Sequence, residues 1–573
     1  MGTDDGLGGG IASGLARFGA SLAAGAILAF GLLQRQGNTD ARWLLALAAS
    51  APFFVILLWP RLPRDLPTFN RTVVRLGTLL VVAFLLTSIH LVRLQVVRAD
   101  DLASETRVTA GGETVANQRI LLEQLRRQRG RIVDRNGQLL ADTAISPDGY
   151  ALRRYPSAVG SYTVGYYSPQ LYGLAGLEAA YDPYLRGAAG SNALDTLQRD
   201  LLHEPLVGND LILTLDLKLQ QVADEALAGR AGAVVALDPR TGAILANVSA
   251  PHFDPQQLAV NPSEEERDVA RARAYWAATN AADSGDPLLP RGSQGLYVPG
   301  SIFKTLTAAA ALDSGVASPT KVYPDPGQIV IDGHEIIELN RPQPVKDQYT
   351  LTEGYLYSLN IVFAQIALND IGTVRMNEYA KRFGFGQEIP FNGAPNAKGP
   401  YGAASAVSAD PNYLSNKPAL ADTGFGQGEL LVSPLHMALV TAAMANDGKM
   451  PEPYLVGAIR TNGGNVTTQT RPRTWLTPIS AGTAAQVRAL MIGSVESGGS
   501  RGAKLDGLVV GGKTGTAELG DGTSHAWFIC FAGKPGQPPE IAIAVIVERA
   551  GPGSTNALPI ARKVIEAYFA GKR

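Results

Sequence analysis

Residues 298–306 read Val298-Pro299-Gly300-Ser301-Ile302-Phe303-Lys304-Thr305-Leu306, and this is the stretch from which the fold is recognised. The Pro-Gly pair punctuates the chain, and the Ala- and Leu-rich run after it predicts a helix that ends near Gly315. Ser301 would stand at the start of that helix, where free amide groups and the helix dipole favour a developing negative charge. Lys304 follows after roughly 300° of helical rotation, so the two side chains are expected on one face, about 60° apart.

This pair suits nucleophilic catalysis. A serine hydroxyl needs a base to act as a nucleophile at neutral pH. Lysine can be that base if burial and cationic neighbours lower its pKa by roughly 3 units, from about 10.4 to near 7. A lone Ser-x-x-Lys pattern is usually only a helix cap followed by a surface lysine. The pair therefore gains weight only from other motifs.

Two such motifs follow along the chain. Ser358-Leu359-Asn360 lies within residues 352–368, where the helical periodicity is broken. Gly511-Gly512-Lys513-Thr514-Gly515-Thr516 follows a short strand expected at 508–510. An apolar run comes soon after it, so the motif is expected on or beside a sheet edge. A glycine in a strand lets a substrate backbone approach closely.

Together, in this order and context, the three motifs resemble the fingerprint Ser-x-x-Lys, Ser-x-Asn, Lys-Thr-Gly of penicillin-recognising serine enzymes. The resemblance covers about residue 129 to the end, and it includes a short pedestal typical of one subgroup. Ile302 departs from the pattern, because a small hydroxyl residue often stands there. Thr423–Gly428 and Asp210–Asp216 are similar to stretches of the catalytic domain of these transpeptidases. Arg129–Gly137 and Gly176–Glu178 resemble the membrane-proximal part of class B, monofunctional penicillin-binding proteins.

The resemblance implies a role for each catalytic residue. Ser301 would attack the carbonyl of a peptide ending in D-Ala-D-Ala and form an acyl-enzyme, while Lys304 takes the serine proton. Ser358 would relay that proton to the leaving D-Ala. Asn360 would orient Lys304 and the donor amide. Lys513 would supply positive charge near the substrate carboxylate.

The same resemblance implies a substrate-binding strand. The hydroxyls of Thr514 and Thr516 would bind the substrate carboxylate, and Gly515 between them belongs to the same motif. The backbone N–H groups of Ser301 and Thr516 would form the oxyanion hole, where one donor is typically worth about 10²–10³ in rate. An amine of a neighbouring peptidoglycan stem peptide would then take the acyl group. β-Lactams would be covalent inhibitors, and neither a cofactor nor a metal is expected.

The expected fold class is α+β, with a penicillin-binding or serine β-lactamase-like transpeptidase domain over 209–573. Strands expected at both ends of this domain enclose a helix-rich middle, which favours one antiparallel sheet flanked by helices. A small pedestal module over 98–208 would precede it. The dipeptide Asn136-Gly137 between two apolar stretches predicts a hairpin there. The expected strands are 211–215, 233–237, 243–248, 508–510, 527–531 and 541–547.

The first part of the chain, 1–97, is expected to be a membrane region. Its three apolar runs, 18–33, 43–59 and 76–92, are near the lower length limit for a bilayer-spanning helix. The loop between the second and third runs is basic, which predicts a cytoplasmic side and places the catalytic domain outside the cell membrane. The alternative is that the first run, or the first two, lie at the membrane interface. The basic loop residues are Arg61, Arg64, Arg71 and Arg75.

Composition excludes several classes. The formal net charge of −1 gives no basic surface for nucleic acid. Cys530 is the one cysteine, so no intramolecular disulfide or cysteine-cluster metal site can form, and its apolar surroundings predict a buried thiol.

Gly498–Gly502 matches the serine-hydrolase elbow only formally, since a helix is expected before it and a strand after it. His334–Glu338 lacks the second histidine of a zinc-protease helix and favours a hairpin. A packing or surface role is expected for His525 rather than a catalytic one.

Three other functions remain open at this point. A D,D-carboxypeptidase or a β-lactamase-type hydrolase would use the same motifs and transfer the acyl group to water. A penicillin sensor would bind without turnover, but it should carry a metalloprotease between its membrane spans, and the loop 60–75 is far too short for one. A bifunctional synthase would need a glycosyltransferase domain before the catalytic domain, and residues 98–208 are too few to form one. A separate SEDS-type membrane polymerase is therefore the partner that the resemblance implies, whether in elongation, division or sporulation.

Overall fold

The structure is a computed structural model that describes residues 5–33, 40–63, 65–98, 107–108, 114–115, 125–190, 207–391 and 402–571. The chain divides into two compact units, Met1–Gln124 and Leu125–Arg573, and each is described here by itself. The predicted domain boundaries at 97 and 208 stay predictions. Much of the predicted pedestal, including residues 116–124 and 191–206, lies outside the described residues.

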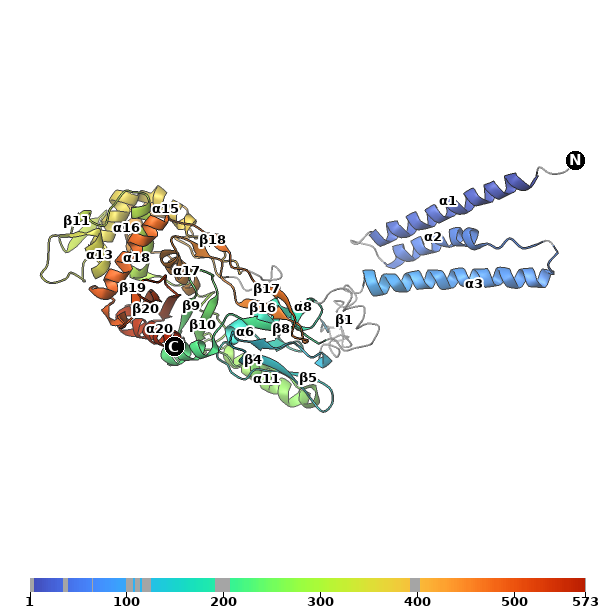
Figure 1. The fold of residues 1–573 in the computed structure, drawn as a ribbon, viewed down its shortest axis with the longest axis horizontal. Helices are drawn as coiled ribbons and strands as arrows, with labels where there is room; N and C mark the ends of the chain where they lie inside the picture. Colours follow the sequence, from blue (N-terminus) through green and yellow to red (C-terminus); the bar gives the residue numbers. More distant parts are fainter. Residues whose placement is uncertain are drawn as a thin grey trace. The chain divides into compact units, whose positions relative to one another are not determined.

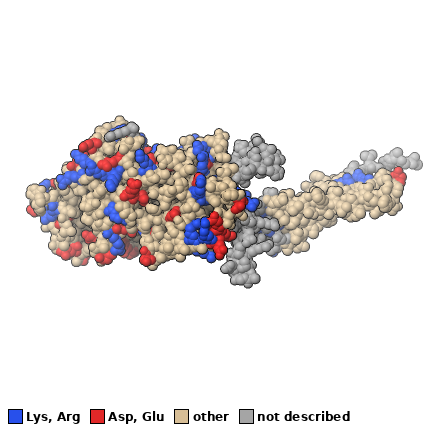
Figure 2. All heavy atoms as spheres, turned by 90° about the horizontal axis from the view of Figure 1, so that it is seen from below, with Lys and Arg blue, Asp and Glu red and all other residues tan. Residues whose placement is uncertain are grey.

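The first unit contains three helices, which Figure 1 shows side by side: α1 (Asp5–Leu33), α2 (Asp40–Leu58) and α3 (Thr68–Val92). The three predicted apolar runs fall on these helices. Ala41–Leu58 and Thr68–Gln95 are long and apolar enough to cross a membrane, whereas the apolar stretch Gly14–Ala29 is shorter. On the face shown in Figure 2, these helices carry few charged side chains over most of their length. The π-helical turn η1 (Arg93–Val97) extends α3, and β1 (Arg107–Val108) pairs with β2 (Thr114–Val115).

A small polar cluster joins α2 to α3. The indole N–H of Trp43, whose side chain is fully buried, donates to Nδ1 of His90 at 3.0 Å. The guanidinium of Arg93 lies 4.9 Å from the centre of the same indole ring. These contacts pack the polar end of α3 against the start of α2.

The second unit is built on a five-stranded, fully antiparallel sheet. Its strands come from both ends of the catalytic region, as predicted, so the antiparallel sheet flanked by helices is confirmed. β19 is one of the two edge strands and has ten residues rather than the three expected, so the Lys513–Thr516 motif lies inside it. In sheet order the strands are β10 (Ile244–Ala250), β9 (Gly232–Leu237), β21 (Ile541–Val547), β20 (Ser524–Gly533) and β19 (Val509–Glu518).

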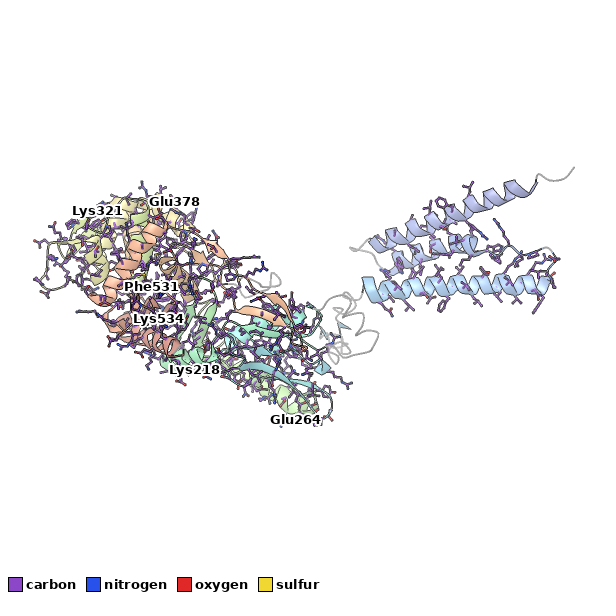
Figure 3. The ribbon with its side chains drawn as sticks, viewed as in Figure 1. Lys218, Glu264, Lys321, Glu378, Phe531 and Lys534 are labelled. Carbon is purple, nitrogen blue, oxygen red and sulfur yellow. The ribbon has the colours of Figure 1, made fainter. Side chains whose placement is uncertain are left out.

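Tertiary packing explains the longer strand. A side chain at Gly511 would meet the ring of Phe531 at 2.2 Å, and one at Gly512 would meet the ring of Phe528 at 2.6 Å. Figure 3 labels Phe531 among the side chains of the sheet. Gly511 and Gly512 therefore make room within the strand for aromatic rings of β20.

Helices cover both faces of this sheet (Figure 1). On one face, α10 (Leu217–Leu227) and α20 (Leu558–Ala570) pack with the buried thiol of Cys530. Aspartate directly before a helical run predicts an N-cap, and the Asp216 side chain does cap α10 by accepting from the N–H groups of Lys218 and Leu219. The other face packs against α17 (Pro434–Ala445) and α18 (Ala481–Glu496), and α12 (Lys304–Asp313) packs in turn against α18.

The helix-rich middle stands beside this second face. Its hairpin of β12 and β13 turns at Asp332-Gly333, both with positive φ, so the predicted hairpin at His334 is confirmed. The elements are β11 (Val322–Pro324), β12 (Gln328–Ile331), β13 (His334–Ile337), β14 (Gln348–Thr350), α13 (Leu351–Tyr357), α14 (Asn360–Gln365), η5 (Ile366–Ile371), α15 (Gly372–Arg382), η6 (Tyr413–Ser415) and α16 (Lys417–Phe425).

A second, six-stranded sheet joins the region before residue 208 to the region after it. The predicted hairpin at Asn136-Gly137 is present, with Gly137 at φ 83°. Residues 125–190 thereby belong to the same compact unit as the catalytic sheet. In order, the strands are β17 (Val466–Gln469), β16 (Val456–Arg460), β8 (Asp210–Leu213), β3 (Ile132–Val133), β4 (Leu139–Ile145) and β5 (Ala151–Arg154).

Short elements complete the unit. They are α6 (Ser161–Val164), β6 (Tyr167–Ser168), β7 (Gly173–Leu174), α7 (Gly176–Ala180), α8 (Asp182–Leu185), η2 (Pro255–Leu258), η3 (Pro262–Glu264), α11 (Glu265–Thr279), η4 (Gly300–Phe303), β15 (Met450–Pro451), β18 (Thr474–Leu476), η7 (Arg501–Ala503) and α19 (Gly553–Asn556).

Candidate active site

Ser301 lies on the 3₁₀ turn η4, which leads directly into α12. In a 3₁₀ turn, residues three apart are eclipsed, so Ser301 and Lys304 stand closer to one line than the expected 60°. Gly300 fixes the position of the turn. It has φ 58°, and its N–H donates to the Gly426 carbonyl at 2.9 Å. A Cβ at Gly300 would lie 2.6 Å from the Thr516 carbonyl oxygen, so the turn packs directly against β19.

Lys304 is fully buried and held by three hydrogen bonds. Its Nζ donates to the Ser358 carbonyl at 2.6 Å, to Asn360 Oδ1 at 2.7 Å and to Ser358 Oγ at 3.3 Å. No described group makes a hydrogen bond to Ser301 Oγ. Catalytic hydrogen bonds are often absent before substrate binds, and Ser301 faces the cavity described below.

The break between α13 and α14 brings Ser358 and Asn360 to Lys304. Ser358 has φ 64° and ends α13 in the left-handed conformation. The N–H of Leu359 then donates to the Gly354 carbonyl at 2.8 Å, and α14 begins at Asn360. The predicted interruption of helical periodicity is confirmed, and it is what turns both side chains inward.

Lys513 approaches the same serine from β19. Its Nζ donates to Ser358 Oγ at 2.8 Å and to the Thr514 carbonyl at 3.0 Å. The Ser358 hydroxyl therefore connects Lys304 and Lys513. A proton can pass between these groups without any of them moving far.

Burial controls the charge of both lysines. Burial lowers the pKa of Lys304 to about 7, while the carboxylate of Glu338 acts in the opposite direction. Burial and, after it, the charge of Lys304 place the pKa of Lys513 well below its usual range. The predicted lowering for Lys304 thus has desolvation as its main cause, rather than a cationic neighbour. A neutral Lys304 amine can accept a proton near pH 7.

The sequence did not single out Glu338 for this site. It follows β13 and is buried, with its side chain 6% exposed. Its Oε2 accepts from the N–H of Ile361 at 3.0 Å, and its Oε1 accepts from the N–H of Asn340 at 3.3 Å. Burial raises the pKa of Glu338, and Lys304 opposes this rise. The only signal in the sequence is a glutamate between apolar residues.

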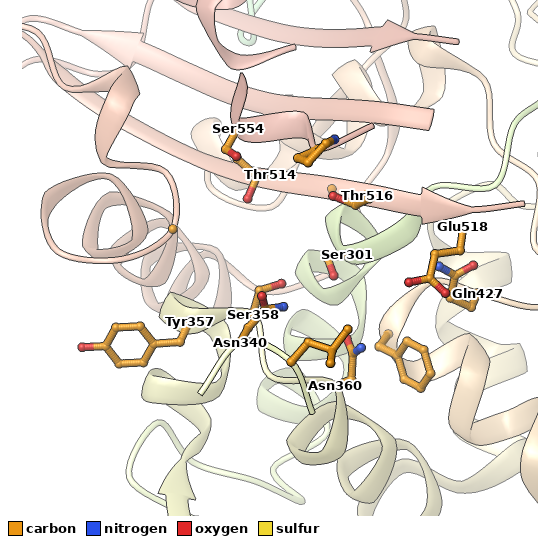
Figure 4. Close-up of a pocket in the computed structure, with 15 residues that line it drawn as sticks. Ser301, Asn340, Tyr357, Ser358, Asn360, Gln427, Thr514, Thr516, Glu518 and Ser554 are labelled. Atoms are coloured by element: carbon orange, nitrogen blue, oxygen red, sulfur yellow. The ribbon is translucent and has the colours of Figure 1, made fainter. Parts of the chain in front are cut away.

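A cavity of about 420 Å³ opens over Ser301 (Figure 4). Six of the eight predicted site residues line it, and Lys304 and Lys513 reach it through the Ser358 hydroxyl. The structure therefore brings all eight together. The predicted residues in the lining are Ser301, Ser358, Asn360, Thr514, Gly515 and Thr516. The others are Leu339, Asn340, Tyr357, Phe425, Gln427, Gly499, Glu518, Pro552 and Ser554.

The motifs set aside in the sequence have structural roles. Gly498–Gly502 lies between α18 and β19, and the Ser500 hydroxyl is buried against Ser494 Oγ at 2.9 Å. The His525 ring packs edge-on against Tyr297, with ring centres 5.4 Å apart. Within the part of the chain that the structure describes, no three His, Cys, Asp or Glu side chains group as metal ligands.

Comparisons with known proteins show the family to which this catalytic unit belongs. Residues 232–566 match the family model described as the penicillin binding protein transpeptidase domain. The peptidoglycan D,D-transpeptidase PbpA of Mycolicibacterium smegmatis is 32% identical over 525 residues, covering 87% of this chain and 99% of that protein. PbpA of Mycobacterium tuberculosis is 31% identical, covering 88% and 100%. A ceftriaxone acyl-enzyme structure of M. tuberculosis penicillin-binding protein A has a TM-score of 0.70 and 32% identity, covering 78% and 99%.

Proposed function

This chain belongs to the penicillin-binding protein transpeptidase family, and we propose from this that Ser301 is the nucleophile with which it cross-links peptidoglycan. The protein is a class B, serine-type peptidoglycan D,D-transpeptidase and a target of β-lactams. One observation supports this assignment. The buried Lys304 amine, which makes three hydrogen bonds, lies in the same site as Ser301 and the Lys513–Thr516 part of the edge strand.

Acylation begins with the neutral Lys304 amine. Ser301 Oγ attacks the carbonyl of the penultimate D-Ala, and its proton moves to Lys304 Nζ. The oxyanion that forms is stabilised by the backbone N–H groups of Ser301 and Thr516. The C–N bond then breaks, and the leaving D-Ala amine receives its proton through the Ser358 hydroxyl. Lys513, Thr514 and Thr516 hold the carboxylate of the leaving residue.

The second half of the reaction reverses this proton path. The amine of a neighbouring stem peptide attacks the Ser301 ester and gives up a proton through Ser358 to Lys304. The ester C–O bond breaks, Ser301 Oγ regains its proton, and a new amide joins the two peptides. Asn360 keeps Lys304 oriented through both halves, which its 2.7 Å hydrogen bond supports.

Labelling with a fluorescent penicillin tests the nucleophile. Wild-type protein in membranes should become covalently labelled, and Ser301→Ala should lose the label because the ester oxygen is gone. Ser554→Ala, which also removes a cavity hydroxyl, is the matched control and should keep the label. Persistent labelling of Ser301→Ala would refute the assignment of the nucleophile.

The acceptor separates the alternatives. Purified protein with a D-Ala-D-Ala donor and an amine acceptor should give the cross-linked peptide, together with free D-Ala. Release of D-Ala with water as the only effective acceptor would favour the carboxypeptidase. Acylation without any turnover of peptide would favour a sensor.

Membrane anchoring follows from the apolar helices, and we propose three spans with the catalytic unit outside the cell. Cys530 is buried, so single introduced cysteines can report topology through a membrane-impermeant maleimide. Three spans predict a labelled Asn38→Cys and a protected Thr3→Cys. Labelling at both positions would indicate two spans, and protection at both would indicate one.

We also propose a SEDS-type membrane polymerase as the partner, because no part of the described chain offers a glycosyltransferase domain. The test is whether the full-length protein co-purifies with such a polymerase from detergent-solubilised membranes. Loss of the complex on replacing 1–97 by an unrelated membrane anchor is the expected result. An unchanged yield of complex would argue against these helices as the docking site.

A further inference from the structure

Glu518 is the one carboxylate among the residues that line the active-site cavity in the described chain. It lies at the end of β19 and is exposed. Among the described residues, no hydrogen bond or ion pair reaches its carboxylate. The mechanism above makes no use of it. A free negative charge in a substrate cavity is expected to select among ligands by their charge.

The strand fixes where Glu518 stands relative to the reaction. Side chains two apart on a strand share a face, so Thr514, Thr516 and Glu518 line one side of the cavity in that order. Ser301 lies beside Thr516, because the Gly300 turn packs against the Thr516 carbonyl. Figure 4 shows Ser301 between the Thr514 and Ser358 side and the Glu518 and Gln427 side.

A bound donor peptide is expected to lie along β19, between Thr514 and Glu518. β19 is the edge of its sheet, so an extended peptide can lie along its free side. The leaving residue with its carboxylate occupies the Lys513 and Thr514 end in the proposed function, on which this inference rests. The part of the donor before the scissile bond then points toward Glu518, about 7 Å further along the strand than Thr516.

We propose that Glu518, with the side-chain amide of Gln427 in the same cavity, forms a subsite for a positively charged amine on the donor, on the side of the scissile bond away from the leaving residue. The chemistry is consistent with the substrate. Each stem peptide carries the amine that serves as acceptor in cross-linking, and a primary amine is protonated at neutral pH. A stem peptide that acts as the donor therefore carries an ammonium group into the cavity.

Matched penicillins test the subsite without the acceptor step. Ampicillin differs from penicillin G by an added ammonium group on the acyl side chain, and carbenicillin differs by an added carboxylate. The test compares the second-order acylation rate constants of the protein with these three penicillins. Relative to penicillin G, wild-type protein should favour ampicillin and disfavour carbenicillin, each by about 2- to 5-fold, as for an exposed ion pair.

Charge variants at one position give the decisive comparison. Glu518→Gln should bring both ratios near one, and Glu518→Lys should reverse them, while the penicillin G rate stays within about 2-fold. The wild-type ratios should also shrink at high salt, where an exposed charge pair is screened. Glu378→Gln, an exposed glutamate on α15 that Figure 3 labels, is the matched control and should leave the ratios unchanged.

A peptide pair extends the test to the natural reaction. A donor ending in Lys-D-Ala-D-Ala should have a higher kcat/KM than its Nε-acetyl form, and Glu518→Gln should remove this difference. Unchanged penicillin ratios in Glu518→Gln, or equal loss of all three rates, would overturn the subsite. Failure of every penicillin to acylate wild-type protein would instead overturn the proposed function, so the two failures are distinguishable.

Discussion

At the scale of single residues, the active site depends on a buried amine without a full counter-charge. The Lys304 amine has one carbonyl, one amide oxygen and one hydroxyl as partners, all neutral. Glu338 is close enough to act electrostatically, but its own hydrogen bonds go to two backbone N–H groups. Burial thus brings the pKa of Lys304 close to 7, and the carboxylate of Glu338 keeps this pKa from falling further.

The pH dependence of acylation should report Lys304. Below its pKa of about 7 the amine is protonated and cannot accept the Ser301 proton. The second-order rate constant for penicillin G should therefore rise with pH, about tenfold per unit below pH 6, and level off above pH 8. Stopped-flow or quenched labelling between pH 5.5 and 8.5 measures this. A rate constant that still rises about tenfold per unit at pH 8.5 would show that Lys304 is not the base, and thermal melts over the same range control for unfolding.

Substituting Glu338 should separate its two functions. Glu338→Gln keeps an oxygen acceptor but removes the charge that raises the pKa of Lys304, so the acid limb of the same profile should move to lower pH. Glu338→Ala also leaves the N–H groups of Ile361 and Asn340 without their acceptor. It should lower the free energy of unfolding by about 1–3 kcal/mol. An acid limb at the wild-type pH in Glu338→Gln would argue against the electrostatic role.

At the scale of elements, catalysis depends on two interruptions of helices. The 3₁₀ turn η4 aligns Ser301 with Lys304, and the left-handed Ser358 separates α13 from α14. The second interruption brings Ser358 and Asn360 within hydrogen-bond distance of Lys304. The long edge strand β19 completes the site, because its glycines accommodate the Phe528 and Phe531 rings of β20.

Gly300→Ala should disconnect the nucleophile turn from β19. Alanine disfavours φ 58°, and its Cβ would lie 2.6 Å from the Thr516 carbonyl oxygen. The turn must shift, so the acylation rate should fall by at least about 10²-fold, as expected for lost positioning.

Gly315→Ala is the matched control for this change. Gly315 has φ 71° at the end of α12, but nothing lies within 4 Å of its added Cβ. It should lose about 1 kcal/mol of stability from backbone strain and keep its acylation rate. Equal effects of the two variants on acylation would mean that strain alone, rather than the contact with Thr516, matters.

At the scale of the whole second unit, a buried charge network ties the residues before 190 into one body. Glu178 is fully buried and receives Arg129 at 2.9 Å and Arg153 at 2.6 Å. Burial alone would raise the pKa of Glu178, but Arg153 and Arg129 hold it below its usual range. Arg129 also reaches Asp182 at 2.6 Å, so the network connects the segment before β3 with β5, α7 and α8.

Glu178→Ala should destabilise this unit strongly. It would leave two buried guanidinium groups without their shared counter-charge, which costs about 3–5 kcal/mol. Urea unfolding of the purified protein measures the loss. Glu566→Ala, which breaks an exposed pair with Arg562, should cost less than about 1 kcal/mol. A loss of similar size in both variants would mean that the buried network adds no special stability.

The sequence by itself determined the features that local rules set. The Pro-Gly before Ser301, the cap at Asp216, the Asn136-Gly137 turn and the broken periodicity around Ser358 each encode a conformation in a few residues. The apolar periodicity gave the strands of the catalytic sheet and the three N-terminal helices. The order of the three motifs then identified the family and brought forward the residues that the structure assembles.

Only the tertiary structure decided the features that depend on residues far apart in the chain. Burial of Lys304, and with it a pKa near 7, requires segments more than 50 residues away. β19 extends over ten residues rather than three, and its glycines pack against aromatic rings of β20, a partner strand that the motif itself does not contain. Glu338 and Glu518 look like ordinary surface glutamates in the sequence. Desolvation and electric potential come from the whole surroundings of a group, so no local pattern could reveal that one lies beside the base and the other in the cavity.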